Sequence, residues 1–437
     1  MRRFLRLAGV LFLCLPQALN AQQTTIFHGG PSHVGVYEGS GLQSFRHVAW
    51  KVRTAGQIYS SAAIDSGVGY VGSTDGGVYA INLSNGTVRW RFATEGRVTS
   101  SPAVAKGLVI VSSYDGNIYG LDVATGKEQW RFVTGGEHRF TATHLHGAIP
   151  ATEAMPDPYD IFLSSPTVVG ELVYVGSGDG NVYALHALSG TLRWKFKTGD
   201  VVHASPSVTD GVVYIGSWDS WFYALDAQNG ALKWRFKTGE DPDIHNQQGI
   251  PSSAAVVDGM VYFGCRDGHL YALDAATGSW KWDFFTGGAW VSSSPAVYQG
   301  KVWFGTGSNH ELRALDALTG KEEFTFTFDR GIFSSPAIAG GLVYVGGMDG
   351  KMTAFRLTTG TPAWVFQTPE SAASSAAYMM AANAAAQDTS AAADRPFYDN
   401  MMVRFHNSLT GSIMASPVPV GDVIYVGSTD GYFYALQ

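Results

Sequence analysis

Histidines and polar side chains gather in three stretches that interrupt an otherwise regular sequence. Six of the twelve histidines lie in or beside them. Imidazole and carboxylate groups bind divalent metal ions, and histidine also transfers protons near neutral pH. We predict a ligand site built from His203, Asp241, Asp243, His245, Asn246, Gln247, Trp290, Arg330, Phe333, Arg404 and His406, with a second cluster at His138, His144 and His146.

Metal binding is one interpretation of these residues. The run "HLH" (144–146) with His138, or His245 with Asp241 and Asp243, offers suitable donor atoms. Their spacing matches no established metal motif, and histidines in loops are usually solvated. We therefore assign neither a metal ligand nor a catalytic residue from the sequence.

The three stretches interrupt a unit that occurs eight times. One copy reads "VYVGSGDGNVYALHALSGTLRWKFKTG" (173–199), and the last copy, "GSTDGYFYALQ" (427–437), ends early. Each unit predicts four short strands, because Asp-Gly and Thr-Gly turns separate its apolar runs. Four-stranded units of about 40 residues are typical of β-propellers. The sequence therefore predicts an all-β, eight-bladed propeller over residues 46–437, after a lead segment at 22–45.

The two chain ends complement each other. The eighth unit lacks its fourth strand, and an unmatched strand, "HVAWKVRT" with Trp50, stands at the N-terminus. Pairing these two would leave no open sheet edge between the ends. We expect the N-terminal strand to complete the last blade. The repeated tryptophans, tyrosines and turn aspartates are expected to be scaffold, with the aromatic rings packed between blades.

The inserts are predicted to lie on one face of the ring. They occupy 136–160, 240–249 and 367–407, each between an outer strand and the inner strand of the next blade. A four-stranded meander places all such connections on one face, where scaffolds often carry function. The third insert is alanine-rich and favours either a short helix over the channel mouth or a surface loop.

One ring of positions varies within the repeat. Before each inner strand an apolar residue and a serine recur in all eight units, which we attribute to packing. The position after the apolar residue differs between units: it is Tyr59, Thr99, Leu163, His203, Pro251, Ser292, Phe333 or Met414. This variation predicts a ring that is free to contact a ligand, with His203 as its titratable member near neutral pH.

The N-terminus has the pattern of a secretory signal. Residues 1–21 combine Arg2, Arg3 and Arg6 with an apolar run that is too short to span a membrane. Their removal lowers the formal net charge from −7 to −10, which argues against nucleic acid as a partner. We expect an exported protein, periplasmic or extracellular, without a transmembrane segment. Cys265 would remain as its single cysteine, so no internal disulfide is expected.

The stretch "YALDAATGSWKWDF" (271–284) resembles the tryptophan-docking repeat of the pyrroloquinoline quinone (PQQ) propeller family. The segment "FHGGPSHVGVY" (27–37) is similar to the lead of small exported members related to the outer-membrane-assembly propeller lipoprotein. The resemblance implies two functions. One is a scaffold that binds an envelope protein or a small-molecule ligand through the insert-bearing face. The other is a small quinoprotein dehydrogenase acting on alcohols or sugars.

The dehydrogenase interpretation makes PQQ with Ca²⁺ the candidate cofactor. Dehydrogenases of the family, as the resemblance implies, hold both on the ring axis, with an aspartate base and usually a disulfide between adjacent cysteines. This chain has no adjacent cysteine pair and no C-x-x-C-H motif. PQQ has three carboxylates and a flat ring, which Arg139, Arg330, Arg404, Trp218, Trp290 and Phe333 would suit. We favour the scaffold over the enzyme.

Overall fold

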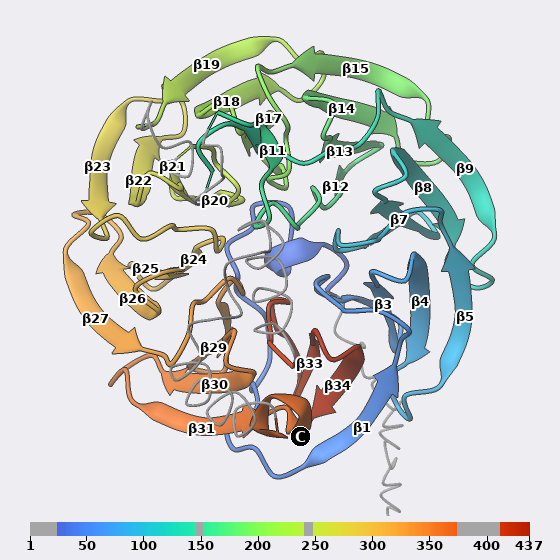
Figure 1. Ribbon diagram of the computed structural model, residues 1–437, viewed down its shortest axis with the longest axis vertical. Coiled ribbons are helices and arrows are strands. Elements are labelled where there is room, and N and C mark those ends of the chain that lie inside the picture. The colour runs from blue at the N-terminus through green and yellow to red at the C-terminus, as the bar shows by residue number, and fades with distance from the viewer. Residues whose placement is uncertain (1–23, 146–151, 240–247, 374–410) are drawn as a thin grey trace, which may run out of the picture.

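Eight four-stranded antiparallel sheets form a closed ring in the computed structural model (Figure 1). The structure describes residues 24–145, 152–239, 248–373 and 411–437. The predicted signal segment and much of the second and third inserts lie outside these residues. The predicted eight-bladed all-β propeller is confirmed.

Each blade runs from an inner strand at the channel to an outer strand at the rim. Blade 1 contains β2 (Ala63–Asp65), β3 (Val68–Gly72), β4 (Gly77–Asn82) and β5 (Val88–Ala93). Blade 2 contains β6 (Ala103–Ala105), β7 (Leu108–Ser112), β8 (Asn117–Asp122) and β9 (Glu128–Val133). Blade 3 contains β12 (Thr167–Val169), β13 (Leu172–Gly176), β14 (Asn181–His186) and β15 (Leu192–Lys197). Blade 4 contains β16 (Ser207–Thr209), β17 (Val212–Gly216), β18 (Trp221–Asp226) and β19 (Leu232–Lys237).

The other half of the ring repeats this pattern. Blade 5 contains β20 (Ala255–Val257), β21 (Met260–Gly264), β22 (His269–Asp274) and β23 (Trp280–Phe285). Blade 6 contains β24 (Ala296–Tyr298), β25 (Lys301–Gly305), β26 (Glu311–Asp316) and β27 (Glu322–Thr327). Blade 7 contains β28 (Ala337–Ala339), β29 (Leu342–Gly346), β30 (Lys351–Arg356) and β31 (Pro362–Gln367). Blade 8 contains β32 (Val418–Val420), β33 (Val423–Gly427), β34 (Tyr432–Leu436) and the N-terminal β1 (Val48–Arg53).

The N-terminal strand closes the ring as predicted. In Figure 1, β1 lies along the outer edge of β34, and the order of the sheet is β1-β34-β33-β32. The pairing is antiparallel and runs from Val48 opposite Leu436 to Arg53 opposite Tyr432. Because the first and last strands share one sheet, no blade edge is left unpaired between the chain ends.

The outer-strand tryptophans join neighbouring blades. The indole of Trp90 donates a hydrogen bond to the carbonyl of Val123 in the next blade (3.0 Å). A Cβ added to Gly126 would lie 2.6 Å from the same ring, so the Thr-Gly turn needs a glycine there. Trp364 continues the pattern at the junction with blade 8, which both chain ends build. Its indole donates a hydrogen bond to the carbonyl of Leu42 in the lead segment (2.7 Å). The predicted scaffold role of these tryptophans follows from this geometry.

The turn aspartates also belong to the scaffold. The carboxylate of Asp219, for example, accepts hydrogen bonds from the Trp221 amide (2.9 Å) and the Tyr223 hydroxyl (2.7 Å). It accepts a third from the Gly199 amide (2.7 Å), in the connection that enters blade 4. One carboxylate thus holds the turn, the third strand and the incoming chain together.

The lead segment crosses one end of the channel. It carries a short 3-10 helix, η1 (Phe27–Gly29), which Figure 1 shows near the ring axis. The inner strands of blades 1, 2, 4, 5, 6 and 7 donate backbone hydrogen bonds to the lead segment. The donors are the amides of Ile64, Val104, Val208, Val256, Val297 and Ile338. In blade 8 the equivalent residue is Pro419, which has no amide hydrogen to satisfy. The segment therefore supplies the partners that the inner edges of six blades would otherwise lack.

Candidate functional site

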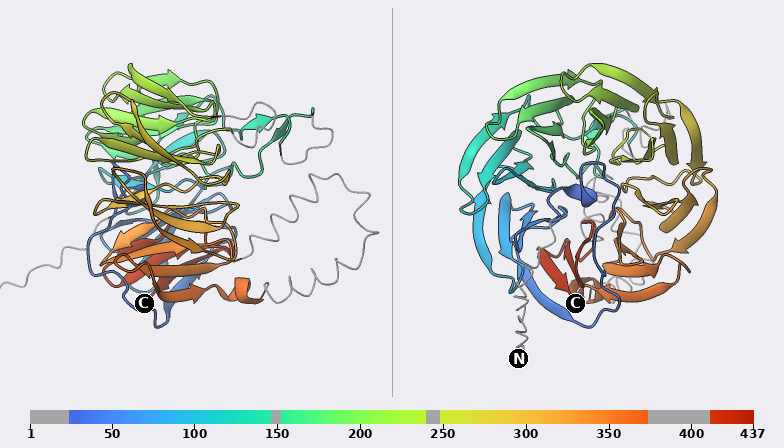
Figure 2. Two further views of the ribbon diagram at one scale, coloured as in Figure 1. Left: turned by 90° about the vertical axis from the view of Figure 1, so that its left-hand side faces the viewer. Right: turned by 180° about the vertical axis from the view of Figure 1, so that it is seen from behind.

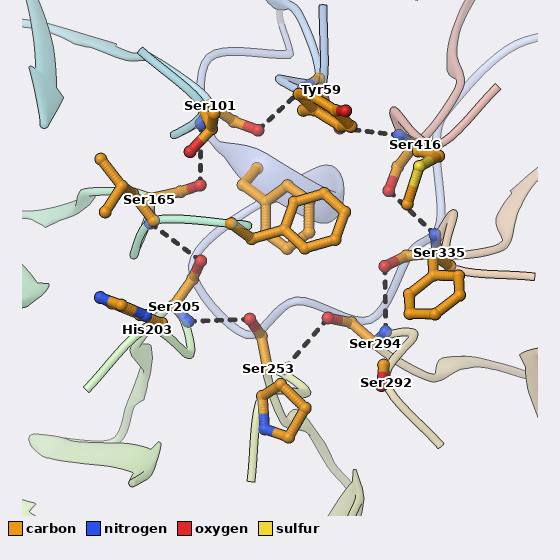
Figure 3. Close-up of a pocket in the computed structure, with 18 residues that line it drawn as sticks. Tyr59, Ser101, Ser165, His203, Ser205, Ser253, Ser292, Ser294, Ser335 and Ser416 are labelled. Atoms are coloured by element: carbon orange, nitrogen blue, oxygen red, sulfur yellow. Dashed lines mark hydrogen bonds between the residues drawn. The ribbon is translucent and has the colours of Figure 1, made fainter. Parts of the chain in front are cut away.

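A small cavity lies on the ring axis between the lead segment and the insert-bearing face (Figure 3). Its volume is about 50 Å³. All eight residues of the variable ring predicted from the sequence line it, together with Phe27 of the lead segment and Phe162 of the first insert connection. The eight variable positions therefore surround one shared space.

Eight serines form a closed ring of hydrogen bonds around the cavity. The amide of each serine donates to the hydroxyl oxygen of the serine in the next blade, as Figure 3 shows for most members, and the last returns to the first. The distances run from 2.9 to 3.1 Å. The members are Ser61, Ser101, Ser165, Ser205, Ser253, Ser294, Ser335 and Ser416. The recurrence of serine therefore has a hydrogen-bonding cause in addition to packing.

The first insert folds over blades 3 to 5. It contains a two-stranded hairpin, β10 (Thr141–Ala142) and β11 (Met155–Pro156), which stands out from the ring in the left view of Figure 2. Phe140 beside the hairpin stacks on Trp218 of blade 4, with ring centroids 4.8 Å apart. After the hairpin, Tyr159 and Ile161 pack with Phe333 at the mouth of the cavity. The insert thus covers the axis from above.

A buried imidazole fastens this insert to the ring. His203, which precedes the inner strand of blade 4, lies between two carboxylates of the insert. Its Nδ1 is 2.6 Å from Asp160 Oδ1, and its Nε2 is 2.8 Å from Glu137 Oε1. All three side chains are at least 95% buried. Burial lowers the pKa of His203, but Asp160 and Glu137 outweigh it and raise the pKa to about 10. His203 is therefore an imidazolium at neutral pH.

The two carboxylates also bind the backbone. Glu137 accepts a hydrogen bond from the Gly178 amide of blade 3 (2.6 Å). A Cβ at Gly178 would lie 2.2 Å from Glu137 Oε1, so only glycine permits this approach. Asp160 accepts from the amide of Phe140 (2.7 Å), which joins the two ends of the insert.

A second buried ion pair lies beside the hairpin. Arg266 Nη1 of blade 5 donates to Asp157 Oδ2 at 2.6 Å, and both side chains are at least 99% buried. The guanidinium lies over the ring of Trp290 (3.9 Å from its centroid) and over that of Trp218 (4.8 Å). The insert is thus tied to blade 4 by His203 and to blade 5 by Arg266.

The predicted site residues do not form one cluster. His203 and Phe333 line the cavity, and Trp290 contacts Arg266 and the ring of Tyr159 (5.2 Å). Arg330 is partly buried between blades 6 and 7 and does not line the cavity, while His138 and His144 are exposed. Predicted residues outside the described part of the chain are Asp241, Asp243, His245, Asn246, Gln247, Arg404, His406 and His146.

Glu137 and Arg266 were not among the predicted site residues. Arg266 occupies the variable position of the Gly-Ser-x-Asp-Gly turn, where other units have residues such as Thr74 and Gly178. That variation was a usable signal. Glu137 gave none, because a single acidic residue in a polar insert is unremarkable. Within the described ranges, no group of three or more His, Cys, Asp or Glu side chains is arranged to hold a metal ion.

The described cavity does not fit PQQ. An engineered cavity of roughly 150 Å³ holds one benzene ring, whereas this cavity measures about 50 Å³. Its lining consists mainly of serine hydroxyls and apolar groups, and it includes neither lysine nor arginine. The His203 imidazolium is already paired with two carboxylates. A fused-ring tricarboxylate would find neither the space nor the cations it needs.

Solved structures of two functional classes share this fold. BamB from Moraxella catarrhalis matches with a TM-score of 0.65 and 17% identity, over 90% of this chain and 99% of that one. A quinohemoprotein alcohol dehydrogenase from Comamonas testosteroni matches with a TM-score of 0.70 and 14% identity, over 96% and 81%. A europium-containing methanol dehydrogenase gives 0.66 and 15%, over 94% and 91%. At such identities these likenesses concern the fold alone.

Comparison with curated protein sequences gives no significant match. In the described part of the chain, no helix has both the length and the apolar character needed to cross a membrane. A family model described as "Outer membrane protein assembly factor BamB" matches residues 46–155, 154–289 and 280–400, which together cover most of the repeats. The chain therefore belongs to this BamB family of PQQ-repeat propellers.

Proposed function

We propose that this chain is an exported scaffold that binds an envelope protein through its insert-bearing face. The observation that carries the proposal is the small size of the axial cavity, about 50 Å³. Phe27 of the lead segment lies at one end of the cavity, and Tyr159, Ile161 and Phe162 pack at the other. Recognition then falls to the outer surface of the ring, where the first insert stands out.

The way the hairpin is held supports this role. Its base is fixed by two buried ion pairs and by the stacking of Phe140 on Trp218. The exposed side chains of the hairpin, by contrast, include the polar residues Thr141, His144 and Glu153. A rigid base that presents exposed side chains lowers the ordering cost of binding a partner. The family description and the predicted signal segment support an envelope location.

Site-directed photo-crosslinking in the intact envelope tests the proposal. A photoreactive residue would replace Thr141 or Glu153 on the hairpin, and Thr125 or Leu318 in Thr-Gly turns on the opposite face. All four positions are exposed, so they control for accessibility. We expect one discrete protein adduct from the hairpin positions and none from the other two. Equal adducts from both faces, or none from the hairpin, would contradict the proposal.

The alternative function is a small PQQ-dependent dehydrogenase. Such an enzyme would need the axial cavity to widen, because its volume is about 50 Å³ and Tyr159 and Ile161 pack in one cluster with its lining residue Phe333. Titration with PQQ and Ca²⁺, followed by dye reduction with a panel of alcohols and sugars, separates the two functions. We expect neither a change in PQQ absorbance nor turnover. Turnover with any of these substrates would establish the enzyme.

A further inference from the structure

The axial cavity is lined by hydroxyl groups whose hydrogens have no acceptor among the described residues. Each of the eight serines in the ring accepts a backbone amide through its Oγ, and none of these Oγ atoms donates a hydrogen bond within the described part of the chain. Thr99 lines the same space and is only 4% exposed. Its Oγ1 is buried and makes no hydrogen bond to any described residue. One shared space (Figure 3) is therefore surrounded by O–H donors.

The serine ring strengthens its own donors. A hydroxyl that accepts a hydrogen bond is polarised and becomes a better donor in its turn. All eight serine hydroxyls are in this state, because the ring of hydrogen bonds closes on itself. Buried donors are costly while they are unpaired, so a group that brings acceptors into the cavity is favourable.

The charges around the cavity favour an anion. The lining residue His203 is an imidazolium paired with two carboxylates. At the lining residue Tyr59, Arg97 and Arg139 both oppose the rise in pKa that burial causes. The groups whose charges act on Tyr59 and His203, together with the imidazolium, are thus three cations and two anions, with a formal sum of +1. One monovalent anion would balance this sum, as a buried charge requires.

The size and the walls of the cavity suit a small ion. A water-sized group needs about 10–15 Å³, and the cavity measures about 50 Å³. Apart from the hydroxyl groups, its lining is largely apolar and includes Phe27, Phe333 and Met414. Such walls do not replace a tight hydration shell, so the site favours an ion that loses its water easily. Chloride and bromide meet this condition better than fluoride or sulfate.

We propose that the axial cavity is a binding site for a monovalent anion of about the size of chloride. Thr99 and members of the serine ring donate hydrogen bonds to the ion, while the backbone amides of the ring keep their present acceptors. His203 keeps its two carboxylates and contributes only its charge. The site goes beyond the proposed function, since it stands whether or not the hairpin binds a protein.

Thermal unfolding in different sodium salts at equal ionic strength tests this site. Chloride and bromide are the probes, and gluconate, which is too large for the cavity, controls for charge screening. An ion that binds only the folded protein raises the melting temperature. We expect the melting temperature to be at least about 2 °C higher in about 100 mM chloride or bromide than in gluconate.

Two variants locate the effect. Thr99→Val removes the unpaired hydroxyl in the cavity and keeps the shape of the side chain. Ser112→Ala is the matched control, because Ser112 Oγ is also buried without a partner among the described residues but does not line the cavity. Neither change removes a hydrogen bond within the described chain, so both variants should fold. Thr99→Val should weaken chloride binding about tenfold, and Ser112→Ala should leave it unchanged.

Crystals grown in bromide identify the occupant directly, because bromide scatters anomalously and water does not. We expect an anomalous peak inside the cavity, within hydrogen-bond distance of Thr99 Oγ1. Density there without an anomalous signal would show that water alone fills the space and would overturn the proposal. Equal melting temperatures in chloride and gluconate, or an equal response of Thr99→Val and Ser112→Ala, would also overturn it.

Discussion

Asp160 Oδ1 lies 2.6 Å from His203 Nδ1, so an insert between blades 2 and 3 is paired with the residue that leads into blade 4. The pair is almost fully buried, and Glu137 contacts Nε2 on the other side of the imidazole. An imidazolium between two carboxylates is stable only while all three remain together. The insert is therefore fastened to blade 4 by a buried group of three charges, and removal of one of them would leave the others uncompensated.

Removing one carboxylate should destabilise the fold strongly. We expect Asp160→Asn to lower the free energy of unfolding by about 3 kcal/mol, because a buried imidazolium loses one of its two anions. Urea denaturation measures the change. Glu171→Gln is the matched control, since Glu171 forms an exposed ion pair with Lys106, for which we expect less than about 1 kcal/mol. Similar losses in the two variants would contradict the importance of burial.

The same imidazole predicts an alkaline loss of stability. The pKa of His203 is raised from 6.5 to about 10 in the folded protein, so its contribution is complete below the unfolded pKa and is lost as the pH rises through about 10. The free energy of unfolding should decline between pH 7 and 9, and the decline should be smaller in His203→Gln. The buried His28 and His33 have lowered pKa values, so their effects fall on the acid side of this window. Parallel pH profiles for both proteins would contradict the assignment.

Two glycines separate the contributions of backbone strain and ring contact. Gly126 (φ +69°) and Gly107 (φ +76°) both have left-handed backbones, but only Gly126 lies under a tryptophan. Gly107→Ala should cost about 1–2 kcal/mol from backbone strain alone. Gly126→Ala should cost at least about 1 kcal/mol more, because its Cβ overlaps Trp90 and overpacking adds to the strain. Thermal unfolding of both variants measures the difference, and equal melting temperatures would disprove the docking role of Trp90.

The serine ring makes a further prediction. Ser205→Ala removes the acceptor of the Ser165 amide, which then remains buried and unpaired, at a cost of about 1–3 kcal/mol. Ser279→Ala, on an exposed turn, should change stability by less than about 0.5 kcal/mol. Hydrogen exchange at the Ser165 amide should accelerate in the first variant alone. Unchanged exchange there would show that water replaces the hydroxyl without cost.

The repeat made the fold predictable, whereas the site depended on contacts that only the ring brings together. Trp50 marked the missing fourth strand, and the variable ring that contains His203 indeed lines the axis. His203 was predicted to contact a ligand, but its ring nitrogens are occupied by Glu137 and Asp160. Those partners are 66 and 43 residues away. No local sequence pattern predicts such a contact, because it depends on how the first insert folds back onto blade 4.

The contacts of the lead segment and of β1 affect when the fold can be completed during synthesis of the chain. Residues 24–37 hydrogen-bond to inner strands as distant as Ile338, and β1 pairs with β34 up to Leu436. Contacts between such remote positions slow folding, because the chain loses much entropy before they form. The pairing of β1 with β34 can therefore form only after the last strand has been made. Until the final strand is made, β1 lacks its partner in the sheet, and an unpaired strand edge can pair with another chain.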